Sequence, residues 1–254
     1  MTGIPMTGTP MTGTLTIAGL GPGSDAMVTP EVSAALALAT DIVGYIPYVA
    51  RIAPRPGLTL HGTDNRVELD RAIHALRMVK LGQRVVVVSS GDPGVFAMAS
   101  AVFEAVEASP EYAALDIRVL PGITAMLAAA AAIGAPLGHD FCALNLSDNL
   151  KPWATIENRL RHAAQGDFAM AFYNPRSASR PDTFARVLDI LRHECSPDRL
   201  ISFARAVSTP DQHIVTLTLA EARPEMADMR TVVILGNSAT RRVGRYVYTP
   251  RGAA

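Results

Sequence analysis

The chain has 254 residues, 49% of them hydrophobic and 18% charged, a balance that excludes an intrinsically disordered protein and leaves one large domain or two small ones. Lys and Arg number 23, and Asp and Glu also number 23, so the formal net charge is zero. Without a global positive field, the chain is not expected to bind nucleic acid or an anionic membrane surface.

Cysteine usage and the chain start give further expectations. The two cysteines, Cys142 and Cys195, have no ligand-like spacing, which excludes a disulfide scaffold and a thiolate metal cluster. We expect no metal, and a reducing cytoplasm as the location. The most apolar stretch, 123–137, is shorter than the ~20 residues of a membrane span. Residues 1–13 repeat Met-Thr-Gly, which we interpret as a disordered leader or alternative start sites.

From Thr14 onwards, short β-branched runs alternate with helical stretches, which predicts parallel βαβ units. The first strand, 15–18, ends in a glycine cluster at 19–23. A helix follows with Thr29 as its N-cap and Pro30 at its first position, and its body runs through Ala39. A second, amphipathic helix begins at about Asn65 and ends before Gly82.

The run 85–88 consists of four valines, as expected of a central strand covered on both faces. It leads into a turn-rich segment at 89–94. A third strand, 116–120, leads into 121–125 and an alanine-rich helix. Because ligands of open α/β sheets bind beyond the carboxyl ends of strands, the loops after these three strands are predicted to line one crevice.

The segment 134–151 breaks this rhythm, so we predict an interdomain connection there, with an N-terminal domain at 14–138 and a C-terminal domain at 139–254. The second half is predicted to form a mixed sheet. Its expected elements are helix 153–165, strand 168–173, helix 181–194, strands 200–205 and 213–219, a short helix at about 220–227, and strand 231–235.

The glycine loops suggest binding roles, each beside a plainer alternative. Asp92 stands in a Gly-Asp-Pro-Gly turn whose glycines allow close approach of a ligand, although such turns are common at surfaces. Thr124 places a hydroxyl at a helix start, where an N-cap is the plainer interpretation. In the cluster 19–23, Pro22 removes an N–H that a phosphate would use, so a dinucleotide cradle is disfavoured.

Two further segments carry polar candidates. Arg176 and Arg180 follow a predicted strand, and a guanidinium matches a carboxylate bidentately, unless the loop is simply solvated. In the predicted connection, His139, Asp140 and Asp148 are candidates for acid–base chemistry, although a structural role is the plainer alternative for His139.

With these loops in view, the sequence resembles the tetrapyrrole methylases over about 14–250. The family marks are Gly19-Leu20-Gly21-Pro22-Gly23, Ser90-Gly91-Asp92-Pro93-Gly94 and Pro121-Gly122-Ile123-Thr124-Ala125. Narrower marks are Val43-Gly44-Tyr45-x-x-Tyr48, the segment 134–141 with Leu146-Ser147-Asp148, and Tyr173-Asn174-Pro175-Arg176-Ser177. One departure is Ser24, because many members carry Asp there, whereas here Asp25 comes next.

The resemblance implies two α/β domains with a cleft between them (a class III methyltransferase fold), a homodimer, and methyl transfer from S-adenosylmethionine (SAM) with S-adenosylhomocysteine as product. The narrower marks imply methylation of precorrin-3B at carbon 17 with ring contraction. The implied cofactor contacts are Gly91, Asp92, Val95, Thr124, Ala125, Tyr173, Ala206 and Val207. Gly21, Pro22 and Gly23 would face the substrate, together with Arg176 and Arg180, while His139, Asp140 and Asp148 are the candidate acid–base groups.

Two alternatives stay open at this point. One is a methylase of the same fold that acts on another ring position or on the cobalt-containing intermediate, cobalt-factor III. The other is a non-catalytic module that binds SAM or a tetrapyrrole. The three glycine loops together with the arginine loop favour the enzyme.

Overall fold

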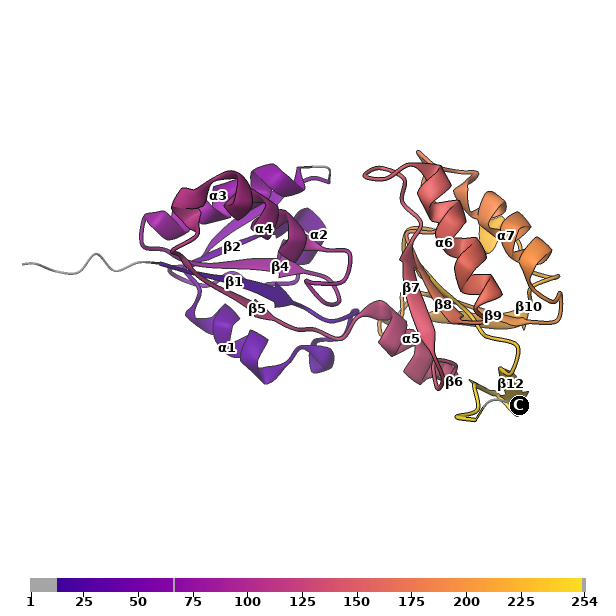
Figure 1. The fold of residues 1–254 in the computed structure, drawn as a ribbon. Helices are drawn as coiled ribbons and strands as arrows, with labels where there is room; N and C mark the ends of the chain where they lie inside the picture. Colours follow the sequence, from indigo (N-terminus) through magenta and orange to yellow (C-terminus); the bar gives the residue numbers. More distant parts are fainter. Residues whose placement is uncertain (1–12, 66, 253–254) are drawn as a thin grey trace, which may run out of the picture. The chain divides into compact units, whose positions relative to one another are not determined.

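The computed structural model describes residues 13–65 and 67–252, which form two compact units that divide between Thr124 and Ala125. Each unit has its own sheet and core (Figure 1). Positions 1–12 of the expected leader lie outside the described residues. Gly13, its last residue, belongs to the first unit because its N–H donates to Val79 O at 3.2 Å.

Unit 1 is a five-stranded sheet in the order β3-β2-β4-β1-β5, and every pair in it is parallel, as predicted. Its elements are β1 (Thr14–Gly19), α1 (Pro30–Leu38), β2 (Asp41–Tyr45), α2 (Ile46–Val49), β3 (Thr59–Thr63), α3 (Glu68–Lys80), β4 (Arg84–Ser89), α4 (Met98–Ala108) and β5 (Asp116–Leu120), with 3-10 turns η1 (Asp25–Met27) and η2 (Pro110–Tyr112).

Helices cover both faces of this sheet: α3 and α4 lie on one face and α1 on the other (Figure 1). The valines of β4 alternate accordingly, with Val85 and Val87 in the core under α3 and α4 and Val86 and Val88 in the opposite core. This double coverage is why the central strand is apolar at every position. The predicted N-cap of α1 is confirmed, since the Thr29 hydroxyl accepts from Val32 N at 3.2 Å.

Unit 2 contains a mixed five-stranded sheet in the order β10-β9-β11-β8-β7, in which only β7 and β8 are parallel neighbours. A separate three-stranded sheet has the order β12-β13-β6. The elements are α5 (Ala125–Ile133), β6 (Gly134–Ala135), β7 (Phe141–Asn145), α6 (Trp153–Gln165), β8 (Ala169–Tyr173), α7 (Thr183–Glu194), β9 (Leu200–Arg205), β10 (His213–Thr218), η3 (Pro224–Met226), β11 (Thr231–Leu235), β12 (Arg241–Val243) and β13 (Tyr246–Tyr248).

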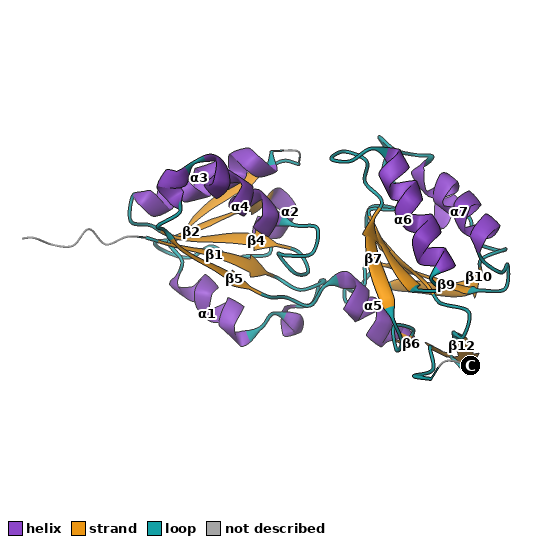
Figure 2. Cartoon of the chain, in the orientation of Figure 1, coloured by secondary structure: helices purple, strands orange, loops and turns teal. Residues whose placement is uncertain are grey.

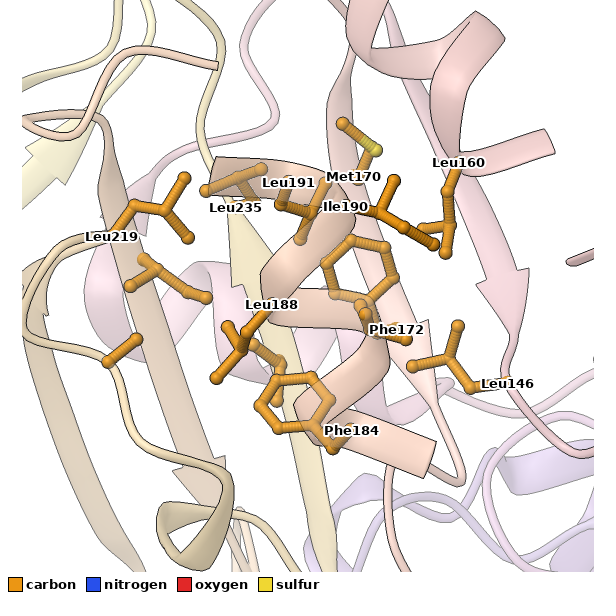
Figure 3. Close-up of a cluster of buried hydrophobic side chains, with 14 of the residues drawn as sticks. Leu146, Leu160, Met170, Phe172, Phe184, Leu188, Ile190, Leu191, Leu219 and Leu235 are labelled. Atoms are coloured by element: carbon orange, nitrogen blue, oxygen red, sulfur yellow. The ribbon is translucent and has the colours of Figure 1, made fainter. Parts of the chain in front are cut away.

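The largest core of unit 2 lies between its sheet and the helices α6 and α7. Figure 3 shows Phe172 of β8 and Phe184 of α7 among the leucines that fill this space. On the opposite face, α5 packs against small side chains such as Ala171 and Ala204. The alanine-rich sequence of α5 therefore serves close packing of a helix on a sheet.

The structure differs from the sequence predictions in several places. The expected connection at 134–151 contains β6 and β7, and the units divide before α5, because α5 packs on β11 of the second sheet. The expected helix at about 220–227 is only the 3-10 turn η3. Strands β2 and β3 and helix α2 are additional elements of unit 1, and Figure 2 labels β2 and α2 among its alternating strands and helices.

Within the part of the chain that is described, no helix combines the length and apolarity needed to cross a bilayer. The same residues contain no group of three or more His, Cys, Asp and Glu side chains that could hold a metal ion.

Candidate active site

In unit 1, the loops after β1, β4 and β5 meet through their backbones. Gly21 N donates to Gly91 O at 3.2 Å, and Gly91 N donates to Gly21 O at 2.8 Å. The three loops that the sequence predicted to converge therefore form one junction, which we call the glycine junction (Gly19, Gly21, Gly91 and Gly122).

Glycine is required at this junction for two reasons. A Cβ at Gly19 would stand 2.5 Å from Gly91 O, and a Cβ at Gly122 would stand 2.1 Å from the same oxygen, closer than real contacts allow. Gly21 and Gly91 have φ angles of +66° and +64°, the left-handed region that glycine enters without steric cost. The glycine motifs thus bring three chain segments within backbone contact.

The carboxylate of Asp92 ties two of these loops together. Its Oδ1 accepts from Gly94 N at 2.8 Å, within its own turn, and its Oδ2 accepts from Gly122 N at 3.0 Å, in the loop after β5. Asp92, predicted as a cofactor contact, is therefore a clasp that shapes the loops carrying Gly91, Val95 and Thr124. The Thr124 side chain is itself 4% exposed.

Sequence reasoning missed Arg51, which anchors the loop after β1. Its Nη2 donates to Leu20 O at 2.8 Å and its Nη1 to Gly21 O at 3.4 Å, and it pairs with Asp25 at 3.6 Å. Arg51, Leu20 and Asp25 are among the residues that line a cavity of about 270 Å³ beside the loop. Ser24, at the position where many family members carry Asp, caps η1 by accepting from Ala26 N. The carboxylate that pairs with Arg51 comes from the next residue, Asp25. The sequence signal that could have pointed to Arg51 is the motif Gly44-Tyr45-x-x-Tyr48, which ends shortly before it.

That mark places two tyrosines beside Arg51. The rings of Tyr45 and Tyr48 meet edge to face, with centroids 5.3 Å apart. Burial raises the pKa of the Tyr48 hydroxyl, the neighbouring Tyr45 adds to the increase, and Arg71 and Arg51 oppose it. Tyr48 is therefore a neutral phenol at the carboxyl end of β2.

In unit 2, three predicted cofactor contacts lie in one cluster. The Tyr173 hydroxyl, at the end of β8, accepts from Met126 N at 3.0 Å and so satisfies an N–H in the first turn of α5. Ala125 and Tyr173 pack against the core that contains Val207. The predicted cofactor residues therefore form two groups, one in each unit. Gly91, Asp92, Val95 and Thr124 belong to unit 1, and Ala125, Tyr173, Ala206 and Val207 belong to unit 2.

Several loop residues of this region hold a strained backbone. Ala206 has a φ of +49°, its N–H donates to Arg230 O at 2.9 Å, and its carbonyl accepts from Thr209 Oγ1 at 2.8 Å. Among the described residues, the other non-glycine residues with positive φ are Phe96, Asp167, Asn174 and Ser208. All except Asp167 follow the carboxyl end of a strand, and such strain is concentrated at functional loops.

The two candidate arginines differ in their surroundings. The Arg180 side chain is 10% exposed, pairs with Asp148 at 3.8 Å, and donates to Leu146 O and Asn174 O at 3.4 Å each. It therefore links the loop after β7 to the loop after β8. Asn174 reinforces this link by donating to Asn145 Oδ1 at 3.1 Å. Among the described residues, the Arg176 side chain makes one hydrogen bond, from its Nε to Pro181 O at 3.0 Å.

The three candidate acid–base residues do not form one cluster. His139 and Asp140 precede β7, where the His139 Nδ1 accepts from Asp140 N at 2.8 Å, whereas Asp148 follows the strand. A five-residue strand rises about 17 Å, so His139 and Asp140 lie at one end of β7 and Asp148 lies at the other. Only Asp148 shares the carboxyl edge with Tyr173.

Comparisons with known proteins identify the family to which these loops belong. A profile of the Tetrapyrrole (Corrin/Porphyrin) Methylases matches residues 14–223. The crystal structure of the methyltransferase CobJ has a TM-score of 0.93 and 76% sequence identity, and the match covers 94% of this chain and all of that one.

Two curated relatives are similar along almost their whole length. The precorrin-3B C(17)-methyltransferase of Sinorhizobium sp is 49% identical over 244 residues, which cover 94% of this chain and 96% of the relative. The probable cobalt-factor III C(17)-methyltransferase of Salmonella typhimurium is 37% identical over 239 residues, covering 94% and 98%. With its glycine junction, its mixed second sheet and these matches, the chain belongs to the tetrapyrrole methylase family.

Proposed function

We propose that this protein is a SAM-dependent methyltransferase of cobalamin biosynthesis, which methylates carbon 17 of precorrin-3B and contracts the ring. The observation that carries the proposal is the glycine junction, in which Gly21 and Gly91 exchange backbone hydrogen bonds and Asp92 links the second family motif to the third. The similarity to a precorrin-3B C(17)-methyltransferase over 94% of the chain supports the choice of substrate.

The residues assigned to the cofactor include small ones that leave room for a ligand. Gly91 has no side chain, and Ala125 and Val207 belong to the same apolar cluster as the Tyr173 ring. When bound, SAM supplies an electrophilic methyl group on a sulfonium. The nucleophile is an electron-rich ring carbon, so the enzyme needs no cysteine or serine nucleophile.

The contribution of the chain to methyl transfer is then alignment. An in-line displacement gains most of its acceleration from fixed positions of the reacting groups. Asp92, Arg51 and the glycines fix the unit 1 loops, and Tyr173 fixes the start of α5. Every one of these contacts is formed within a unit by the motif residues or next to them.

For the acid–base step of ring contraction, Asp148 remains the candidate at the carboxyl edge, and Arg180 holds its carboxylate in place. His139 and Asp140 are the weaker candidates because they precede β7. We expect His139→Ala to leave turnover close to that of the wild type and Asp148→Asn to lower it. A large loss in His139→Ala with normal Asp148→Asn would reverse this assignment.

The function is tested by incubating the protein with SAM and precorrin-3B, then recording mass and visible spectra. We expect a product that has gained one methyl group, with the spectral change of a contracted ring. Tyr173→Phe, which removes only the hydroxyl that accepts from Met126 N, should weaken SAM binding in calorimetry. Binding of SAM without any turnover would favour the non-catalytic alternative.

Cobalt-factor III is the second candidate substrate, because the Salmonella typhimurium relative is named for it at 37% identity. Parallel incubations with the two substrates decide between them. We also propose a homodimer and a cytoplasmic location, as the family resemblance implies, and light scattering of the purified protein tests the dimer.

A further inference from the structure

A second cavity lies at the carboxyl edge of the unit 2 sheet. It has a volume of about 350 Å³, and its walls come from the loop after β8 and the turn before β11. These segments meet because β11 runs antiparallel to β8, with Val233 opposite Phe172. The lining residues are Arg176, Ser177, Ala178, Pro181, Asp228, Met229 and Arg230.

Asp228, the acid in the wall, is already engaged. Its Oδ2 accepts from Arg205 Nε at 2.7 Å, and its Oδ1 accepts from Thr231 Oγ1 at 2.8 Å and from Arg230 N at 2.9 Å. Burial would raise the pKa of Asp228, but these hydrogen bonds and the charge of Arg205 lower it below its usual value. The carboxylate therefore neutralises Arg205 and leaves the other arginines of the cavity uncompensated by it.

The two arginines in the wall are weakly compensated. Arg230 pairs with Asp211 at 3.2 Å, but both side chains are more than half exposed, so the pair is weak. Within the described chain, Arg176 has no ion pair, and its single side-chain bond to Pro181 O leaves both terminal nitrogens for a ligand. Two arginines and one aspartate thus line the cavity, and that aspartate is already paired with Arg205.

We propose that this cavity binds one carboxylate arm of the tetrapyrrole substrate, gripped by Arg176 and Arg230 together. The inference rests on the proposed function and extends it to Arg230. The cavity volume lies at the low end of the ~300–1,000 Å³ typical of sites for whole small ligands, which suits an acetate or propionate arm and not a macrocycle. The Ser177 hydroxyl is a neutral donor, and Met229, half exposed, offers apolar contact for the methylenes.

This assignment separates the two arginines of the loop. Arg180 links the loops after β7 and β8, since its Nη1 donates to Leu146 O and Asn174 O and its Nε pairs with Asp148. Its Nη2 reaches Met229 Sδ, in the cavity wall, at 3.9 Å. Arg176 is the arginine with free terminal nitrogens in the cavity. A bidentate grip on a carboxylate needs those two nitrogens, so lysine is a poor replacement.

The test uses a stable probe, so that it does not depend on turnover. Uroporphyrin III carries acetate and propionate arms, and its methyl ester carries the same arms without charge. We expect Arg176→Ala and Arg230→Ala each to weaken uroporphyrin binding about tenfold in fluorescence titration, and to leave ester binding unchanged. Arg241→Ala, which removes an exposed charge on β12, is the matched control and should bind as the wild type does.

The double variant tests whether both arginines hold the same arm. If they do, the double variant, which carries both Arg176→Ala and Arg230→Ala, loses less uroporphyrin affinity than the product of the two single-variant losses. Independent, multiplicative losses would overturn the shared grip, and unchanged uroporphyrin affinity in both single variants would overturn the site.

Two further measurements distinguish the source of the carboxylate and the fate of the proposed function. S-adenosylhomocysteine affinity should stay constant in all variants; a tenfold loss there, with normal uroporphyrin binding, would assign the cavity to the amino-acid end of the cofactor and overturn the proposal. With precorrin-3B, KM should rise in the two alanine variants. If wild-type protein does not turn over precorrin-3B, the proposed function fails, while the uroporphyrin titrations still decide the carboxylate site.

Discussion

The loops at the carboxyl edges of the two main sheets are fixed by different means. In unit 1, backbone meets backbone: Gly21 and Gly91 exchange hydrogen bonds, and Gly122 lies against the Gly91 carbonyl. In unit 2, side chains span the gaps, as Arg180 does between the loops after β7 and β8. A backbone junction has no room for the Cβ of a substituted glycine, whereas a side chain that links two loops can be shortened so that single hydrogen bonds are lost. Substitutions in unit 1 should therefore have larger effects than those in unit 2.

The largest effect is expected for Gly122→Ala. The new Cβ would stand 2.1 Å from Gly91 O and 2.9 Å from Gly19 Cα, and neither neighbour is a flexible side chain. We expect a loss of about 3 kcal/mol in the free energy of unfolding, since overpacked sites force backbone shifts, and a loss of SAM affinity. Urea unfolding and calorimetry measure the two quantities.

Gly94→Ala, in the Asp92 turn next to the glycine junction, is the control for Gly122→Ala. Its Cβ would meet only Asp92 Oδ1, at 3.2 Å, which can shift. Equal destabilisation by the two alanines would contradict the view that backbone contact, and not helix or turn propensity, demands glycine here.

The next effect is expected for Asp92→Ala. Removal of the carboxylate leaves Gly94 N and Gly122 N without their acceptor, at a cost of about 1–3 kcal/mol. Asp92→Asn keeps one oxygen and should recover part of the loss. If Asn and Ala lowered the free energy of unfolding alike, the clasp would not depend on two separate hydrogen bonds.

The contacts that fix the loops of the two units were not equally predictable from the sequence. Glycine after a strand is a local signal, so the junction of unit 1 was predictable, as was the Thr29 N-cap. The link made by Arg180 was not, because the direction of a long side chain depends on the neighbouring loop after β7, a strand that the sequence did not predict. Strands β3 and β7 are edge strands with only partly buried faces. Strand β3 lacks the continuous apolar run that identified β4, and the apolar run of β7, at 141–144, contains none of the β-branched residues that make up β4.

Arg180→Ala should have a smaller effect than either change in unit 1. It removes two bonds to carbonyl oxygens and the pairing of Asp148, whose side chain is 38% exposed and can be hydrated instead. We expect a loss of about 1–2 kcal/mol in urea unfolding. Arg176→Ala in the same loop should cost less than about 0.5 kcal/mol, as at other exposed sites. Equal costs would mean that both arginines link loops.

An effect smaller than that of Arg180→Ala, and with a pH signature, is expected at Asp167, which precedes β8. Burial would raise the pKa of this carboxyl, but hydrogen bonds from Ser238 N and Oγ and the charge of Arg199 outweigh burial and lower it. A lowered pKa in the folded state stabilises the fold above the usual value of about 3.9, and this contribution is lost as the pH falls through the folded-state pKa.

Asp167→Asn isolates that contribution. Asn accepts the left-handed backbone of this position, where φ is +54°, and keeps one oxygen as an acceptor. At pH 7 the variant should be less stable than the wild type by below about 1 kcal/mol, because the carboxylate is partly exposed and screened. The difference should shrink as the pH falls below about 4, where the wild-type carboxyl gains its proton and the variant has none to gain. Urea unfolding in steps from pH 7 to the lowest pH at which both proteins fold measures it, and a difference that stays constant would mean that Asp167 contributes through its shape and not through its charge.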